Sequence, residues 1–539
     1  MHCENSIGVR VRRYPNKSAV ILIIDTLILV PVILFTGIKL TASSAIVIGA
    51  GISGLSAGIY ARLNGYDVTV FESHSQPGGV AACWKRGEYL FDGGIHFLPP
   101  ADPNLDIYDL YLELGLEYLP TVPMNQYCRF TDIEHRTSVD ITDNLDDLQM
   151  RLLARFPEDT SVIYEILSPA RSMSESDTTN FGFDKPSELM GIRDKVSEIW
   201  QMRGFMRFMF GKYALSAEDF SQRISNPVLR DIVKMMFLPE VPIWFISMIL
   251  GQVASGQIAL LENGSISLVS RLVDRLTQLG GKISYRSEVK EILIESDRAV
   301  GIRLEDESQH RADYIIPAMD MHSIFFSLLG GKYVSDNLAY RFAKWDLCRP
   351  ILIINYGVAM EFSDEPWLNI WKLDSPIRIG TEDVSYLMTR IFNYGNSFAP
   401  SGKTVIQVEL ETDWDYWYNL HEFDMDTYQS EKERIASEVA DFHNQFYEGF
   451  KDAIEVTDVS TPFTMWRYTK NYRGAYMGWL PASDLLMTRF KKKIPGLANC
   501  FLAGQWAMGM GGVLPAIYSG RQAIQLVCSS DGRPFQTIQ

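Results

Sequence analysis

Cysteine is scarce in this chain and follows no spacing typical of a metal or disulfide site. The 539-residue sequence contains six cysteines and no Cys-x-x-Cys pair: Cys3, Cys83, Cys128, Cys348, Cys500 and Cys528. Zinc sites and disulfide frameworks need cysteines at short, regular spacings. The sequence therefore argues against both and favours reduced thiols in a reducing compartment.

Basic residues are also in deficit, and hydrolytic and metal-binding motifs are lacking. Lys and Arg total 50 against 66 Asp and Glu, so the formal net charge is −16. Because a nucleic-acid surface needs clustered basic residues, we predict no nucleic-acid partner. The sequence shows no Ser-His-Asp order, His-Glu-x-x-His motif or Walker loop, and its eight histidines do not cluster. We therefore predict neither hydrolysis nor a metal site.

The sequence does contain a strand, a glycine-rich turn and a helix in succession. Residues 45–48 are wholly apolar and lead into Gly49-Ala50-Gly51-Ile52-Ser53-Gly54, after which 55–64 has a helical pattern. In such a unit the first glycine permits a tight turn, and the second lets backbone approach a pyrophosphate. The third lets the helix lie close to the strand. The helix N-terminus attracts phosphate, so we predict binding at Gly49, Gly51, Ser53 and Gly54.

An acidic residue at the end of the next predicted strand completes a dinucleotide-binding pattern. The strand covers 67–71 and is followed by Glu72, about 20 residues beyond Gly51. A carboxylate at this distance accepts hydrogen bonds from ribose hydroxyls and repels a 2′-phosphate. The combination predicts a dinucleotide site that includes Glu72.

Later segments carry a resemblance to one family. A glycine pair follows Glu72, residues 91–97 read Phe-Asp-Gly-Gly-Ile-His-Phe, and 285–316 has paired strands. A strand and glycine turn, 499–516, precede a last helix. In this order the segments resemble the two-domain FAD oxidoreductases that include amine oxidases and phytoene desaturases. The resemblance implies noncovalent FAD, held also by Gly78, Gly79, Val80, Val289, Gly504, Gln505, Gly512 and Val513.

The segment around His96 resembles the retinol saturase and carotenoid isomerase branch of that family. The resemblance implies that this segment passes close to the flavin, so that His96 is the candidate catalytic residue. It could protonate a carbon atom or orient a polar head group; a histidine held by backbone in a tight turn is the alternative. Val80 replaces the arginine of amine oxidases, which weakens that interpretation. Gln505 replaces an acid that many flavoproteins use, which puts the affinity for FAD in doubt.

Length and composition are sufficient for two folded domains. A chain of this length can bury two substantial cores, and its 47% hydrophobic content is typical of globular proteins. We predict an α/β protein in which a Rossmann-like FAD-binding domain carries an inserted α+β substrate domain of antiparallel sheet and helices. The FAD-binding domain is predicted over 41–100, 255–330 and 495–530, and the substrate domain over 101–254 and 331–494.

Two apolar regions raise the question of a membrane. Residues 19–40, preceded by basic residues, would form a helix about 33 Å long, enough to cross a bilayer. We predict that 1–40 is a membrane anchor with its basic side cytoplasmic. A cleaved signal peptide, a mispredicted extension or an amphipathic segment packed on the protein are the alternatives. Residues 200–261 are rich in Met and aromatic side chains. Core helices and an apolar channel or membrane-dipping surface both explain that composition.

These features lead to a main functional hypothesis and three alternatives. The main hypothesis is an FAD-dependent oxidoreductase that saturates or desaturates CH–CH groups of a long apolar polyene or isoprenoid, such as a carotenoid or retinoid. The alternatives are a redox-neutral isomerase or hydratase, a flavin-free module that binds prenylated proteins like the GDP-dissociation inhibitors, and an amine oxidase. We expect an external electron partner (quinone, oxygen or nicotinamide) and a membrane-associated protein whose catalytic body faces a reducing compartment.

Overall fold

The computed structural model describes residues 43–179, 183–201, 206–486 and 488–537. The membrane helix predicted over 19–40 lies outside these residues. Within the described ranges, no helix has the combination of length and apolar character that spanning a bilayer requires. The described residues form one compact unit, and the domain boundaries given above stay a prediction.

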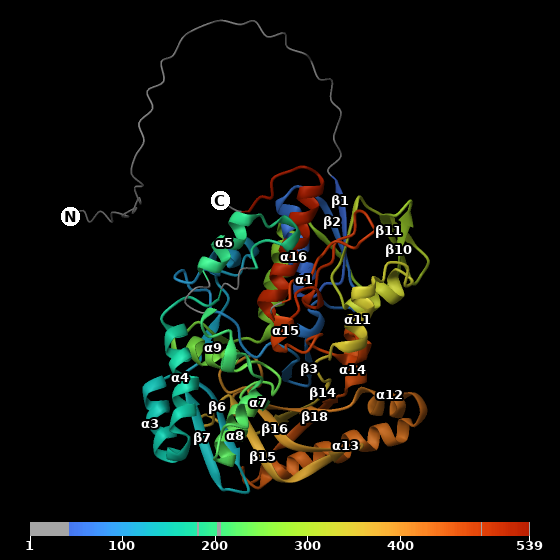
Figure 1. Ribbon diagram of the computed structural model, residues 1–539. Coiled ribbons are helices and arrows are strands. Elements are labelled where there is room, and N and C mark those ends of the chain that lie inside the picture. Colours follow the sequence, from blue (N-terminus) through green and yellow to red (C-terminus); the bar gives the residue numbers. More distant parts are fainter. Residues whose placement is uncertain (1–42, 180–182, 202–205, 487, 538–539) are drawn as a thin grey trace, which may run out of the picture. The chain divides into compact units, whose positions relative to one another are not determined.

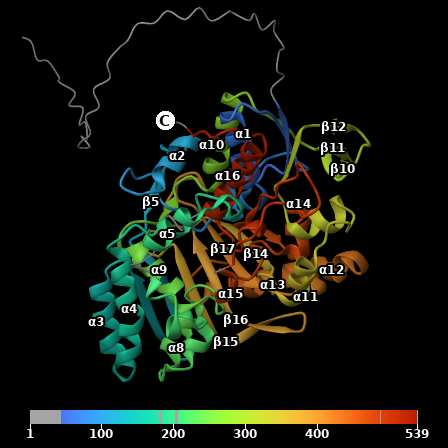
Figure 2. The same cartoon turned by 45° about the horizontal axis from the view of Figure 1, so that its top comes forward.

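A four-stranded parallel sheet forms one centre of the fold. Its order is β13-β1-β2-β9, and the apolar residues of β1 are buried, as expected for a strand covered on both faces. Helices α1, α10 and α16 cover the sheet, and α1 and α16 lie side by side in Figures 1 and 2. The bounds are β1 (Ser44–Ile48), β2 (Asp67–Phe71), β9 (Lys282–Ser284), β13 (Tyr314–Pro317), α1 (Ile52–Leu63), α10 (Ser265–Gln278) and α16 (Val513–Ser530).

The last helix is joined closely to the first. A Cβ at Gly520 of α16 would overlap the carbonyl oxygen of Ser53 and lie 2.6 Å from the nitrogen of Ala57. Only glycine allows this approach. The Ser56 hydroxyl donates to the carbonyl of Ile517 at 2.8 Å. These contacts bring the C-terminal segment to the glycine-rich turn near residue 50.

A seven-stranded sheet forms the second centre, drawn mainly in orange at the lower part of Figure 1. Neighbouring strands are antiparallel except β15 and β6, which are parallel. The predicted antiparallel sheet is therefore mixed, because the β6–β7 hairpin comes from a distant segment and no tight turn dictates its direction against β15. The order is β18 (Ile454–Ser460), β14 (Ile351–Val358), β17 (Thr404–Glu411), β16 (Glu382–Ile391), β15 (Leu368–Ile379), β6 (Gln126–Asp132) and β7 (Thr137–Thr142).

Strand β17 shows how the two faces of this sheet differ. Ile406, Val408 and Leu410 belong to the core beneath α12 (Trp414–Phe423) and α13 (Met425–Asn444). Because side chains alternate along a strand, Gln407 and Glu409 lie on the opposite face. That face carries polar groups into the interior of the molecule.

The remaining elements connect or cover the two sheets. A helical layer with its own core packs on β6 and β7 and comprises α3 (Leu145–Arg155), α4 (Thr160–Ser174), α7 (Ala217–Ser221), α8 (Pro227–Met235) and α9 (Ile243–Ala254). The other helices are α2 (Tyr108–Leu114), α5 (Ile192–Gln201), α11 (Asp336–Lys344), α14 (Pro462–Thr469) and α15 (Ser483–Leu486). The other strands are β3 (Cys83–Arg86), β4 (Tyr89–Asp92), β5 (Thr121–Pro123), β8 (Ala259–Leu261), β10 (Val289–Glu295), β11 (Arg298–Leu304) and β12 (Gln309–Arg311).

A buried histidine on α13 makes stability depend on pH. His443 lies 3.0 Å from the Thr389 hydroxyl and 2.8 Å from the carbonyl of Val439. Burial lowers the pKa of His443 to about 4, against the opposing effect of the Val439 hydrogen bond. The unfolded chain therefore binds more protons between this value and the ordinary pKa of about 6.5, so stability is lost as pH falls through that window.

We expect His443 to lower the free energy of unfolding by about 2 kcal/mol as the pH falls from roughly 7 to 5. His443→Gln should show a correspondingly flatter pH dependence. Urea denaturation of both proteins at the two pH values measures the difference. Equal slopes for the two proteins would show that His443 does not contribute.

Candidate functional site

A cavity of about 410 Å³ is lined by residues of both sheets and by all the predicted glycine turns. Its volume is within the range of small-molecule sites. One end is formed by backbone and polar groups, and the other by apolar side chains. The glycines that line it are Gly49, Gly51, Gly78, Gly79, Gly94, Gly504, Gly511 and Gly512.

Hydrogen bonds join the turns at the polar end. The backbone N–H of Gly78 donates to the carbonyl of Ala50 at 2.9 Å, and Gly51 and Gly78 form a parallel bridge. The Ser53 hydroxyl accepts from the N–H of Gly504 at 2.8 Å. Three turns that are far apart in the sequence therefore form one surface.

Two helix N-termini open onto this surface. The N-caps of α1 and α16 are Gly51 and Gly512, and the first-turn residues of both helices are uncharged. Ile52, Ser53 and Val513 line the cavity. First-turn N–H groups have no partner within their own helix and carry a partial positive charge. The polar end is therefore suited to phosphate or another anionic group.

Gly51 shows that this surface fits a ligand. A Cβ on Gly51 would meet its nearest atom, the carbonyl oxygen of Gly78, at 3.9 Å, and φ is −71°. Neither packing nor backbone conformation requires glycine here, whereas a side chain would project into the cavity. The close approach of a pyrophosphate does require it.

Gly54 has a different task. A Cβ there would overlap the carbonyl oxygen of Gly49 and lie 3.3 Å from Cγ1 of Val47. Gly54 is outside the cavity lining. It sets the distance between α1 and the glycine turn, and so shapes the site from beneath.

Glu72 supports the turn with its carboxylate. Its Oε2 accepts from the N–H of Ala50 at 2.7 Å, and its Oε1 from the N–H of His74 at 2.8 Å. The side chain is buried and lines the cavity. Glu72 therefore holds the glycine turn as well as facing the cavity.

The other end of the cavity is apolar. Strands β15 and β16 and the segment around α8 and α9 supply most of it. Helices α8 and α9 also pack into a core, so the described part of the segment 200–261 contributes both to a core and to the cavity; the membrane-dipping surface stays a prediction. The hydroxyl of Tyr127 donates to the carbonyl of Met236 at 2.8 Å and is thereby satisfied. The apolar end comprises Phe97, Tyr127, Met236, Phe237, Leu238, Phe245, Trp367, Leu368, Ile370 and Met388.

His96 lies in the cavity and is paired with an acidic residue that the sequence did not reveal. Its Nε2 is 3.0 Å from Oε1 of Glu409, and Nη1 of Arg390 is 3.6 Å from the same oxygen. Burial would raise the pKa of Glu409, but its interactions with His96 and Arg390 lower it to about 2. Glu409 is therefore ionised at neutral pH.

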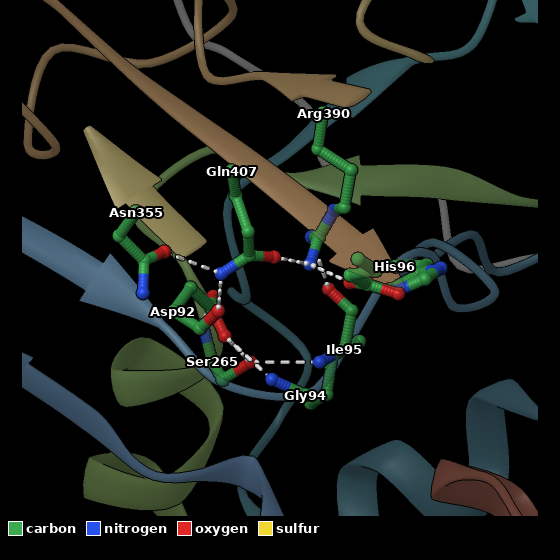
Figure 3. A network of polar contacts seen from close by, with 9 residues as sticks. Asp92, Gly94, Ile95, His96, Ser265, Asn355, Arg390 and Gln407 are labelled. Atoms are coloured by element: carbon green, nitrogen blue, oxygen red, sulfur yellow. Dashed lines mark hydrogen bonds and ion pairs between the residues drawn. The ribbon is translucent and has the colours of Figure 1, made fainter. Parts of the chain in front are cut away.

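A buried polar network holds the loop that carries His96, as Figure 3 shows. Nη2 of Arg390 donates to the carbonyl of Ile95 at 3.0 Å, and Nε2 of Gln407 donates to the carbonyl of Asp92 at 2.7 Å. The Asp92 carboxylate accepts from the N–H and the hydroxyl of Ser265, both at 2.6 Å. The loop is thus fixed from the second sheet and from the start of α10.

A comparison with known families decides the identity of this site. The family model for flavin containing amine oxidoreductases matches residues 52–528, which include Glu72, the later glycine turns and the whole seven-stranded sheet. The chain belongs to this flavoprotein family. FAD is therefore its cofactor, and the predicted oxidoreductase is confirmed.

Similar proteins include enzymes with different printed activities. The flavoprotein is 24% identical over 80% of its length to a chloroplastic prolycopene isomerase of Arabidopsis thaliana, covering 73% of that protein. It is 21% identical over 92% of its length to a 4,4'-diapophytoene desaturase of Methylomonas sp, covering 96% of that protein. Among solved structures, cyclohexylamine oxidase from Brevibacterium oxydans matches with a TM-score of 0.54 and 13% identity, over 91% of this chain and 100% of the other. The last likeness shows the fold alone.

The structure of the flavoprotein brings the predicted site residues together. Gln505 also donates through Nε2 to the carbonyl of Tyr476 at 2.6 Å, so its amide is held by the protein. The individual roles of these residues stay predictions. Those that line the cavity are Gly49, Gly51, Ser53, Glu72, Gly78, Gly79, Val80, His96, Val289, Gly504, Gln505, Gly512 and Val513.

Glu72→Gln is expected to weaken FAD binding by about 10- to 100-fold. Glu72 now accepts hydrogen bonds from two backbone N–H groups, one on each carboxylate oxygen. An amide has one acceptor oxygen, so one of these N–H groups would lose its partner, which costs about 1–3 kcal/mol of binding free energy. Titration of the apoprotein with FAD, followed by flavin fluorescence, measures the change. Glu305→Gln, at an exposed carboxylate, is the control. Unchanged affinity in Glu72→Gln would contradict the supporting role of Glu72.

Proposed function

We propose that this flavoprotein adds or removes double bonds at CH–CH groups of a long apolar polyene or isoprenoid, such as a carotenoid. The observation that carries the proposal is the cavity itself, whose apolar end is continuous with the glycine turns. Aromatic and Met side chains such as Phe237 and Met388 suit a long hydrocarbon chain. The similarity to a diapophytoene desaturase supports the same substrate class.

When bound, FAD can accept or donate a hydride, which carries two electrons. Saturating or desaturating a carbon–carbon bond also moves one proton, which a protein group can take or give. Among the other titratable groups that line the cavity, Glu409 is ionised, and burial raises the pKa of Tyr127 and of Tyr476, where the nearby Cys348 and Glu409 add to the effect. Histidine is the side chain that exchanges protons most readily near neutral pH. We therefore assign the proton to His96.

A redox-neutral isomerase is the second candidate. It is favoured by the similarity to prolycopene isomerases from two plants, and the same cavity and His96 would serve it. The flavin-free alternative disagrees with the family assignment. An amine oxidase would share the fold, but the apolar end of the cavity suits an amine less well than a hydrocarbon chain.

We also propose that the enzyme takes its substrate from a membrane and exchanges electrons with an external partner. Ile192 and Val196 of α5 are 83% and 60% exposed, and apolar side chains at this spacing lie on one helix face. The described cysteines are free and buried, which supports a reducing compartment. Retention of the protein on phospholipid vesicles, and its loss with Ile192→Asp, tests the membrane contact.

The function is tested by the flavin itself. The purified protein is mixed without oxygen with carotenoid precursors in vesicles, or with primary amines, and the flavin absorbance is followed. We expect a polyene to bleach the oxidised flavin in the desaturating direction, or to reoxidise the reduced flavin in the saturating direction, and amines to do neither. Bleaching by amines alone would overturn the proposal. A polyene that changes geometry only when the flavin is first reduced would favour the isomerase.

A further inference from the structure

His96 does not stand alone in the cavity, because its ring is held from the second sheet. The carboxylate of Glu409, on β17, meets Nε2 of His96 at 3.0 Å. The His96 side chain is 31% exposed and that of Glu409 10%. Among the described residues, the other ring nitrogen, Nδ1, forms no hydrogen bond. The two ring nitrogens of His96 therefore differ: Nε2 is bonded to Glu409, and Nδ1 is not bonded within the described part of the chain.

The ionised state of Glu409 decides which nitrogen carries the proton. An ionised carboxylate only accepts hydrogen bonds, so Nε2 must be the donor. Arg390 keeps the carboxylate charged, since its guanidinium is 3.6 Å away and the side chain is 1% exposed. Gln407 in turn fixes Arg390, accepting from Nη1 at 2.7 Å. Arg390 on β16 lies opposite Gln407 on the neighbouring strand β17, and Glu409 is two residues further along β17.

The backbone beside His96 is fixed by the same cation. Arg390 donates to the carbonyl of Ile95, and Ile95 donates its N–H to the Ser265 hydroxyl at 3.3 Å. Figure 3 shows Arg390 and Gln407 directed at this loop from the sheet. Ring and backbone of His96 are therefore held by one connected set of contacts.

We infer that Glu409, supported by Arg390, is a positioning residue that keeps the proton of the neutral His96 ring on Nε2 and leaves Nδ1 to exchange a proton with the substrate. The proton role rests on the proposed function; the assignment of the nitrogens does not. In the desaturating direction Nδ1 would take a proton from a substrate carbon and leave the C–H electron pair in the new double bond, and bound FAD would supply the acceptor for the hydride of the neighbouring carbon. In the saturating direction both transfers reverse.

The charged and titratable groups around His96 are consistent with this assignment. Glu409 contacts the ring from the second sheet and Arg390 contacts Glu409. Tyr476 lines the same cavity, and Asp92 ends β4 just before the loop that carries His96. Asp92 is already bound by Ser265, and Tyr476 stays neutral. Glu409 is the one of these that touches the ring.

The nitrogen assignment is tested by NMR of the FAD-loaded full chain with ¹⁵N-labelled histidine. The His96 signals are identified by their loss in His96→Gln. We expect the neutral ring to carry its proton on Nε2 in the wild type and in the control Glu411→Gln, an exposed acid two residues along β17. Glu409→Gln should give a mixture of both forms, because an amide can donate or accept. A proton on Nδ1 in the wild type would overturn the inference, even if the variant did not fold.

The proton role is tested by turnover. Glu409→Gln is expected to lower kcat by about 10- to 100-fold, within the range of acid–base catalysis. In a His96→Gln background the same change should have less than about a 2-fold effect, because Glu409 acts through His96. Equal losses in both backgrounds would overturn the positioning role. If the wild type converted no polyene, the proposed function would fail, whereas the NMR result would still decide the nitrogen assignment.

Discussion

Gly54→Ala is expected to abolish FAD binding. The new methyl group would overlap the carbonyl oxygen of Gly49 and lie 3.0 Å from its carbon. These are backbone atoms of the glycine turn, so the clash cannot be relieved by a rotamer change. Overpacking of this kind costs about 3 kcal/mol or more, and α1 must move away from the turn that it supports. A loss of more than about 100-fold in FAD affinity follows.

The control for this prediction lies one helical turn further along α1. A Cβ at Gly58 would meet Cδ1 of Leu276 at 3.1 Å, the end of a flexible side chain. Gly58→Ala should therefore retain FAD, helped by the helix propensity of alanine. Flavin content of the two purified variants, with circular dichroism to confirm folding, gives the comparison. Equal flavin content in both would contradict the role given to Gly54.

His96→Gln is expected to lower kcat by about 100-fold or more while FAD stays bound. The loss follows from the proton that His96 is proposed to carry, since general acid–base groups contribute about 10²- to 10⁴-fold. His96 contacts Glu409 and lies beside the apolar end of the cavity. Its removal should therefore leave the glycine turns and the flavin spectrum unchanged. Rates are measured with the polyene that bleaches the flavin.

His135 offers a matched control. Its Nδ1 is 3.0 Å from Oδ2 of Asp132, so it is a second histidine paired with a buried carboxylate, but on the β6–β7 hairpin outside the cavity lining. His135→Gln should keep kcat within about 2-fold of the wild type. If both variants lost activity equally, a general effect on folding would explain the result, and His96 would lose its special role.

The polar end of the cavity could be predicted from sequence because short, continuous motifs indicate it. The turn from Gly49 to Gly54 and the acid Glu72 lie within one strand–helix–strand unit, where spacing alone dictates geometry. The helical pattern predicts a helix over 55–64, whereas α1 begins three residues earlier and spans Ile52–Leu63. Ile52, Ser53 and Gly54 belong to the motif, and their role in the turn concealed that they are already helical.

The surroundings of His96 could not be predicted in full because the residues that hold it are distant in the sequence. His96 was found by resemblance, but its partner Glu409 is on β17 and its anchor Arg390 on β16. Gln407 and Glu409 alternate with apolar residues, which indicates a polar face. Which element covers that face depends on sheet order and register, and neither is local. The parallel pairing of β15 with β6 escaped prediction for the same reason.

The central claim is that this FAD enzyme changes the number of hydrogens on a carbon–carbon bond of an apolar polyene. The most direct measurement is the mass of the product formed by the holoenzyme from a carotenoid precursor supplied in vesicles, with a quinone as electron acceptor for desaturation or dithionite as electron donor for saturation. We predict a product that differs from the substrate by two hydrogens. A product of unchanged mass, or one heavier by a water molecule, would contradict the claim and assign the protein to the isomerases or hydratases.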